Sequence, residues 1–246
     1  LGDVYKRQDE EAANYNVDQT AVNFVINTAQ VNPGLHAGDM KFVDLDGDHT
    51  ISSGSNTADD PGDRKIIGNS LPRYTYSIQG GFDWYGFDFS IYLQGVGHQD
   101  WYPGTNSVFF WGPYARPYSS FIPRDFLSQV WSPENPDAYF PLPIGYLALG
   151  NNRSLGVVND RYLQNLRYLR FKNLTVGYTL PQSWTGKARI ESVRIYFTGE
   201  NLCYWSPLKK HSRYVDPEAA IDRSDAYNNA YYPWQKSFLF GIDVTF

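Results

Sequence analysis

The last ten residues of the chain, SFLFGIDVTF, alternate between large apolar side chains and mostly small or polar ones. The apolar set is Phe238, Phe240, Ile242, Val244 and Phe246. A period of two residues predicts a β-strand with one apolar face. Such a face must be covered either by the protein's own core or by lipid, so this stretch strongly restricts the folds that the chain can adopt.

Four earlier segments show the same alternation and are predicted to be strands: residues 74–84, 86–96, 166–180 and 192–201. Within the third segment, Leu169 and Phe171 stand one residue out of step with Leu174. Because one extra residue in a strand restores the pairing beyond it, this offset predicts a β-bulge near Lys172-Asn173.

The lengths of the connections between these segments separate two kinds of fold. The first link, Tyr85-Gly86, is short enough for a tight hairpin, and residues 181–191 form a second short link. Residues 97–165 and 202–235 are long links. Antiparallel pairing places both short links at one end of the sheet, as in outer-membrane β-barrels. Strands of about ten residues also suit a membrane crossing. We therefore predict an all-β, antiparallel transmembrane β-barrel segment of about five strands.

Composition supports this prediction without deciding it. Aromatic residues make up 17% of the chain, which is typical of a barrel with aromatic girdles but also of a carbohydrate-binding β-sandwich. That soluble sandwich remains the alternative. The sequence contains no run of about 18 apolar residues, so it predicts no transmembrane helix. The net charge is only −5 and basic residues are scattered, which argues against nucleic acid as a partner. Cys203 is the single cysteine, so no internal disulfide can form.

The stretch DLDGDHTI, residues 44–51, resembles a calcium-binding loop, because hard oxygen ligands recur at alternate positions. The candidate ligands are the side chains of Asp44, Asp46 and Asp48 and the backbone carbonyl of Thr50. The match is incomplete. His49 replaces the usual glycine, and Ser55 stands where a bidentate glutamate is expected. The alternative is a solvated loop stabilised by Asx-turns.

The sequence contains no feature that predicts catalysis. Its four histidines lack zinc-binding spacing, and P-loop, dinucleotide and nucleophile-elbow motifs are absent. Several carboxylates fall on predicted polar strand faces: Asp83, Asp88, Glu200 and Asp243. A glycosidase pair could be imagined among them, but a polar barrel lining explains them more simply. We therefore expect that the chain is not an enzyme.

Aromatic residues and prolines are interleaved in the long link 97–165. The candidates for contact with a ligand or a partner protein are Trp101, Tyr102, Trp111, Tyr114 and Tyr118. Three interpretations remain open: stacking on a ligand, packing against a partner, and packing of the loop on itself.

Five stretches, taken in order, resemble one family. They are GDMKFVDLDGDHTI, DRKIIGNSLPRYTYSIQGGFDWYGFDFSIYLQGVG, YLRFKNLTVGYTLPQSW, VRIYFTGENL and YYPWQKSFLFGIDVTF. Together they span residues 38–246 and are similar to the C-terminal part of SusC/RagA-type TonB-linked outer-membrane proteins, also called TonB-dependent receptors. The opening LGDVYKRQ instead resembles translated adaptor sequence, so residues 1–8 are set aside.

This resemblance implies a 22-stranded barrel in a Gram-negative outer membrane, closed by an N-terminal plug through which TonB would act. It implies import of glycan oligosaccharides or peptides with a SusD-like surface lipoprotein as lid. It also implies that Phe246 is a signal for the barrel-assembly machinery and an anchor against outer-membrane lipid. Residues 1–71 are expected to be an outer loop region with the Asp-rich motif, and residues 72–246 the C-terminal strands. Calcium is the one possible cofactor.

Overall fold

The computed structural model describes residues 2–4, 16–19, 37–105, 107–115, 118, 122–143, 149, 154–212, 214–220 and 234–246. The chain divides into two compact units. Unit 1 comprises Leu1–Gly68, Trp101–Gln164 and Asp222–Ala230, and unit 2 comprises Asn69–Asp100, Asn165–Ile221 and Tyr231–Phe246. The first stretch of unit 1 ends close to the predicted boundary at residue 71. However, most of the long link 97–165 also belongs to unit 1.

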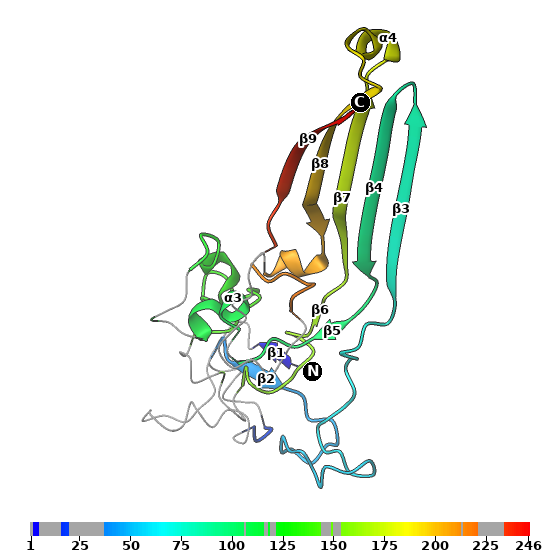
Figure 1. Ribbon diagram of the computed structural model, residues 1–246. Coiled ribbons are helices and arrows are strands. Elements are labelled where there is room, and N and C mark those ends of the chain that lie inside the picture. Colours follow the sequence, from blue (N-terminus) through cyan, green and yellow to red (C-terminus); the bar gives the residue numbers. More distant parts are fainter. Residues whose placement is uncertain are drawn as a thin grey trace. The chain divides into compact units, whose positions relative to one another are not determined.

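Unit 2 contains a five-stranded antiparallel sheet in the order β3-β4-β7-β8-β9 (Figure 1). Its strands are β3 (Thr75–Trp84), β4 (Phe87–Val96), β7 (Tyr168–Thr179), β8 (Ser192–Trp205) and β9 (Ser237–Thr245). All five strands were predicted from alternation. Strand β8 runs four residues further than expected, because Asn201 has a positive φ of 49° and the chain resumes pairing beyond it.

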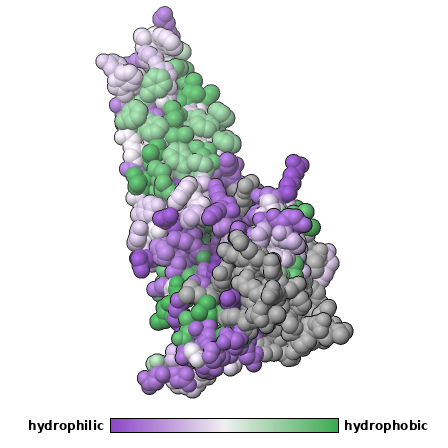
Figure 2. Space-filling view, turned by 180° about the vertical axis from the view of Figure 1, so that it is seen from behind, coloured by the Kyte–Doolittle hydropathy of each residue, from purple (hydrophilic) through white to green (hydrophobic). Residues whose placement is uncertain are grey.

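The strand register gives this sheet one apolar and one polar face. One row across all five strands reads Phe82, Phe89, Val176, Phe197 and Phe240. The adjacent row on the opposite face reads Gly81, Ser90, Thr175, Thr198 and Leu239. The apolar side chains are solvent-accessible rather than packed, and Phe240 is 79% exposed. Figure 2 shows hydrophobic residues gathered over the strands.

Two local predictions about the sheet are confirmed. The register shifts between Phe171 and Asn173, so that Phe171 pairs with Leu93 on the apolar face. The β3–β4 link is the two-residue turn Tyr85-Gly86, with φ values of 46° and 88°. Two successive positive φ angles characterise the type I′ turn, whose twist matches that of a hairpin. Glycine adopts this conformation readily, whereas Tyr85 is an unusual residue for it.

The connections are arranged as predicted. The β3–β4 turn, the β7–β8 link and the C-terminus lie at one end of the sheet (Figure 1). The β7–β8 link contains α4 (Gln182–Thr185) and the 3₁₀ turn η4 (Gly186–Ala188). The two long connections leave from the other end, and the second begins with the 3₁₀ helix η5 (Pro207–Lys210).

The described part of unit 1 is mostly irregular. Strand β1 (Gly2–Val4) pairs with β2 (Met40–Phe42), so part of the segment set aside as adaptor-like takes part in a sheet. The remaining elements are α3 (Val108–Trp111), η1 (Gly112–Tyr114) and η2 (Leu127–Gln129). A short sheet joins β5 (Asp100–Trp101) to β6 (Gln164–Asn165). Among the described residues, no helix is long and apolar enough to cross a membrane.

Candidate functional site

On the polar face of the sheet, Arg194 of β8 binds Asp88 of β4 across the intervening strand. Its Nη2 and Nε atoms donate to the two carboxylate oxygens at 2.6 and 2.8 Å. Gly177 of β7 lies beneath this bridge, and a Cβ atom there would stand 2.3 Å from Asp88 Oδ1. Arg194 Nη1 also reaches Asp243 of β9 at 3.3 Å. The absence of a side chain at residue 177 therefore lets one cation link three of the strands.

Alternation places Asp88 and Asp243 in the predicted polar lining of the barrel, whereas no sequence motif marks Arg194. Its position was nevertheless informative. Arg194 alternates with Val193 and Ile195, so it had to lie on the same polar face as Asp88 and Asp243. The strand order, which the sequence did not supply, brings them together.

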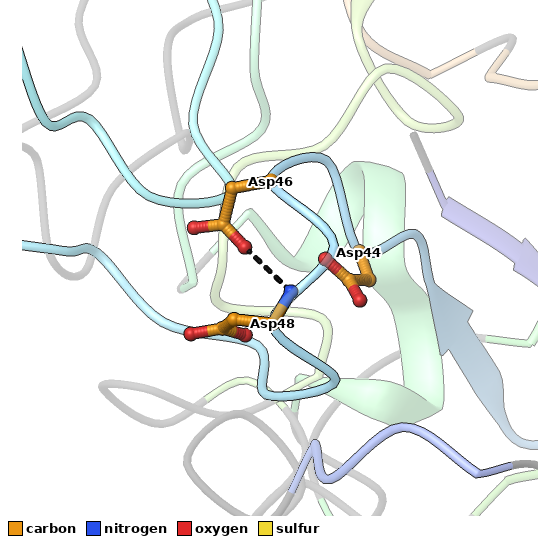
Figure 3. Close-up of side chains that lie close together, drawn as sticks. All are labelled: Asp44, Asp46 and Asp48. Carbon is orange, nitrogen blue, oxygen red and sulfur yellow. Dashed lines mark hydrogen bonds between the residues drawn. The ribbon is translucent and has the colours of Figure 1, made fainter.

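In unit 1, the predicted calcium loop brings its three aspartates together (Figure 3). One carboxylate oxygen from each of Asp44, Asp46 and Asp48 lies within 4.8 Å of the others. Asp44 accepts hydrogen bonds from the backbone N–H groups of Gly47 and His49 at 2.6 and 2.9 Å. Partial desolvation acts to raise the pKa of Asp44, but these hydrogen bonds outweigh it and hold the pKa below its ordinary value.

Asp46 responds in the opposite direction. A hydrogen bond from the backbone of Asp48 lowers its pKa, but desolvation and the charges of Asp48, Asp63 and Asp44 together raise it. A net repulsion among these carboxylates follows, and a bound cation would relieve it.

The departures from a standard calcium loop have different consequences. His49 takes a left-handed conformation with φ of 64°, the geometry for which glycine is preferred at that position. Ser55 does not supply a carboxylate and instead donates from Oγ to Asp60 at 2.7 Å. Asp63 lies beside the loop, but its two oxygens accept from the backbone N–H groups of Leu45 and Ser52. The loop therefore offers three hard carboxylate ligands, and the twelfth-position ligand is missing.

Four of the five aromatic candidates in the long link are buried. Trp111 has no exposed surface, and Trp101, Tyr102 and Tyr114 are also in the core of unit 1. Trp111 packs edge-on against Phe110, Phe140 and Tyr162, with ring centroids 4.8 to 6.2 Å apart. Packing of the link on itself, one of the three interpretations left open, therefore accounts for these four rings. Tyr118, by contrast, is 76% exposed.

The tyrosine hydroxyl groups of this core form hydrogen bonds within unit 1. Tyr114 donates to the carbonyl of Pro141 at 2.5 Å, and Tyr102 donates to the carbonyl of Leu155 at 2.8 Å. Burial raises the pKa of Tyr114 and of Tyr162. It raises the pKa of Tyr139 to about 12, against the opposing effects of a hydrogen bond from Gln164 and the charge of Arg161. These hydroxyls therefore stay protonated at neutral pH and act as structural donors.

Comparison with known proteins agrees with the resemblance drawn from the sequence. No protein-family model matches the chain. TonB-dependent receptor P3 of Formosa agariphila is 29% identical over 233 residues, which cover 91% of this chain and 20% of that protein. TonB-dependent receptor P26 of the same organism is 26% identical over 218 residues, covering 85% of the chain and 20% of the receptor. The resemblance to TonB-dependent receptors is confirmed.

Solved structures named RagAB share the fold. The RagAB peptide transporter superposes with a TM-score of 0.52 and 22% identity, over 74% of this chain and 18% of the other. The open-open state of the RagAB peptide importer gives a TM-score of 0.56 and 20% identity, over 94% of this chain and 21% of the other. The five-stranded sheet thus has the fold of part of a TonB-dependent receptor barrel, which replaces the sandwich alternative. The chain spans about a fifth of the length of the curated relatives.

Within this receptor fold, Phe246 directly follows β9 and is 87% exposed. Strand β9 is one edge of the sheet and β3 is the other. Both edges carry backbone groups that further strands of a closed barrel can pair with.

Proposed function

We propose that this chain is the C-terminal portion of the barrel of an outer-membrane, TonB-dependent importer. In this role β3, β4, β7, β8 and β9 form part of the barrel wall, with the apolar face toward lipid and the polar face toward the lumen. The transport cycle involves no covalent step, in keeping with relatives that are named as receptors and transporters rather than enzymes.

The proposal rests on one observation: the strands are long enough to cross a membrane, and the sheet that they form has one apolar face and one polar face. The row from Phe82 to Phe240 is apolar across all five strands, whereas Arg194 and Asp88 pair on the other face. A soluble sheet buries its apolar face in a core, but here Phe240 and Ile242 are largely exposed. Lipid is the environment that removes the cost of this exposure.

The proposed partners follow from the receptor resemblance. A SusD-like surface lipoprotein acts as lid, TonB acts through an N-terminal plug, and the barrel-assembly machinery recognises the end of β9 with Phe246. The structural neighbours carry the name RagAB, a two-component importer, which supports a lipoprotein partner. Exposed Tyr118 is the residue of unit 1 that we assign to contact with the lid or the ligand.

The proposed substrates are glycan oligosaccharides or peptides. The RagAB structures are named for peptide transport, which favours the second class, while exposed aromatic rings such as Tyr118 suit stacking on sugars as well. The polar face carries both positive and negative side chains, Arg194 and Asp243, and so suits either oligosaccharides or peptides.

Uptake by cells that carry the complete gene tests this proposal. Deleting the gene should abolish TonB-dependent growth on one class of oligomer, oligosaccharide or peptide, as the sole source of the nutrient. Restoring the gene should recover growth, and restoring it in a strain without TonB should not. Fractionation should place the full-length protein in the outer membrane with heat-modifiable migration. Recovery of a stable, detergent-free soluble protein would refute the proposal.

We also propose that the loop of Asp44, Asp46 and Asp48 holds a calcium ion that orders unit 1. The raised pKa of Asp46 and the left-handed conformation of His49 support this assignment. Calorimetric titration of the full-length protein with Ca²⁺ should give one site that is lost in Asp44→Asn/Asp48→Asn. Asp59→Asn, outside the cluster, is the matched control. Unchanged heat of binding in the double variant would refute the site.

A further inference from the structure

The second long connection does not simply extend away from the strands. Asp216, within the β8–β9 connection, contacts Arg170 of β7, whose register partners are Gln94 of β4 and Tyr204 of β8. Leu169 and Phe171 pair on the apolar face, so alternation places Arg170 on the polar face. The segment of residues 206–212 and 214–220 is therefore held on the polar side of the sheet.

The contact is a buried network of charges. Arg170 is 2% exposed, and its Nη2 atom donates to Asp216 Oδ1 and Oδ2 at 2.6 and 2.5 Å. Arg170 Nε lies 2.9 Å from Glu218 Oε2. Glu218 also accepts from Lys172 Nζ at 2.7 Å. Two cations from β7 are thus matched by two carboxylates two residues apart in one turn of the connection, an arrangement that solvent screens poorly.

Aromatic rings surround this network. The Arg170 guanidinium lies 4.8 Å from the ring centroid of Tyr204 and 5.6 Å from that of Trp234. Lys172 Nζ lies 4.4 Å from the Trp234 ring. Cation–π contacts of this kind strengthen when the cation is desolvated. The connection is therefore attached to the sheet from both of its ends.

The rest of the segment is packed. The side chains that it buries are Leu208, Val215, Pro217 and Ala220. At the end of β8, Ser206 caps η5 by accepting from Leu208 N, and Lys209 Nζ donates to Tyr204 O at 2.6 Å. Figure 1 places η5 at the end of the sheet away from α4. A segment with this many buried side chains and ion pairs behaves as part of the wall and not as a mobile loop.

We propose that residues 206–212 and 214–220 form an inward-folded segment that lines and narrows the barrel lumen at its long-loop end, held there by Arg170 and Lys172. This inference rests on the proposed function, because it identifies the polar face with the lumen. An imported molecule then meets the outer surface of this segment before it meets the strand residues Gln94 and Tyr204. The segment thereby sets the width of the passage on this side of the barrel.

Cross-linking in the full-length receptor tests where the segment lies. In a Cys203→Ser background, Gln94→Cys and Ala219→Cys should be joined by a flexible bifunctional maleimide. Leu93→Cys with Ala219→Cys is the matched control, because Leu93 adjoins Gln94 but points to the apolar face. Equal cross-linking of the two pairs would overturn the placement. This readout does not depend on transport, so its failure is distinct from failure of the importer proposal.

Labelling with maleimides of increasing size tests the narrowing. Gln94→Cys should react slowly with large reagents added outside the cell. Asp216→Asn/Glu218→Gln should raise that rate severalfold, with a smaller increase for small reagents. Arg170→Met should act in the same direction, and heat-modifiable migration should verify that each variant has folded. A large-reagent rate at Gln94→Cys that is already high and unaltered by these substitutions would overturn the proposal.

Discussion

Aromatic side chains occupy opposite environments in the two units of this molecule. In unit 2, Phe240 lies on a sheet face and is 79% exposed, and the ring of Phe197 contacts both Phe240 and Phe238. In unit 1, Trp111 has no exposed surface and contacts rings from several turns of an irregular chain. The same residue types therefore form an exposed apolar face in one unit and a self-contained core in the other.

The difference lies in what removes the rings from water. The sheet cannot bury both faces on itself, so it relies on an apolar solvent on one side. The described part of unit 1 has little regular structure to organise a core. Large aromatic rings organise it instead, because each buries a large area and fixes its neighbours by edge-to-face packing. Substitutions in the two units should consequently destabilise the protein by different mechanisms.

The largest expected effect is in the aromatic core of unit 1. Phe140 contacts the rings of Phe110, Trp111, Tyr114 and Tyr162. Phe140→Ala should reduce the stability of unit 1 by about 3–5 kcal/mol, because it leaves a cavity among rings that cannot close together. Hydrogen exchange of the full-length receptor should show faster opening in residues 107–115 and unchanged protection in β7. Tyr118→Ala, at an exposed ring, is the control with little effect.

A somewhat smaller loss is expected on the lipid-facing side of the sheet. Ile242→Arg should cost about 2–4 kcal/mol of barrel stability, because the charge enters the hydrocarbon region. Asp243→Asn, the adjacent residue on the lumen face, should cost little. Urea titration of the full-length protein in lipid vesicles measures both. Equal tolerance of the two substitutions would contradict the assignment of faces.

Much of unit 2 could be predicted from its sequence because each strand carries its own signal. Alternation located the five strands, the break between Leu169 and Leu174 located the bulge, and Tyr85-Gly86 located the hairpin. These are local properties of the chain. The position of residues 206–212 and 214–220 on the polar side of the sheet could not be predicted, because it depends on Arg170 meeting Asp216 across 46 residues.

Unit 1 was less predictable for the same physical reason. Trp111 and Tyr114 stand among prolines without a period, so nothing in the local sequence distinguishes a buried ring from a ligand platform. In the Asp-rich loop the spacing predicted the grouping of Asp44, Asp46 and Asp48. The roles of Asp60 and Asp63, which bind Ser55 and the loop backbone, became clear only from the structure.

An intermediate loss of stability is expected when unit 1 is brought to alkaline pH. The pKa of Tyr139 is raised to about 12, so the folded state keeps this hydroxyl protonated where an unfolded tyrosine loses its proton. The resulting stability is fully present below the ordinary value of about 10 and is lost as the pH rises through about 12. The loss amounts to about 2–3 kcal/mol. Tyrosinate absorbance of the full-length protein should therefore show a late step near that pH.

Tyr139→Phe provides the control for this titration. The substitution keeps the ring that packs on Phe140 and Tyr162 but removes the ionisable group. The late step should diminish by one tyrosine, and the alkaline loss of unit 1 stability should become shallower. A late step of unchanged size would show that other tyrosines account for it.

The smallest effect is expected at Gly177 on the lumen face, where the neighbouring atoms are the ends of flexible side chains. Gly177→Ala places a Cβ within 2.3 Å of Asp88 Oδ1 and 2.8 Å of Arg194 Nε, so the ion pair must separate. Because this pair is partly solvated, its loss should cost only about 1 kcal/mol, measured by urea titration in vesicles. Gly80→Ala in β3, where a Cβ meets no atom within 4 Å, is the matched control and should be neutral or stabilising.

The cost of Gly177→Ala can also be measured in an Arg194→Met background. If Gly177 is present because Arg194 must cross β7 to reach Asp88, then Gly177→Ala should cost less once Arg194 has been removed. A double-mutant cycle isolates that coupling, which should be of the same order as the single cost. An equal cost of Gly177→Ala in both backgrounds would mean that the glycine serves the strand backbone itself. The bridge between β4 and β8 would then be a consequence of Gly177 and not its cause.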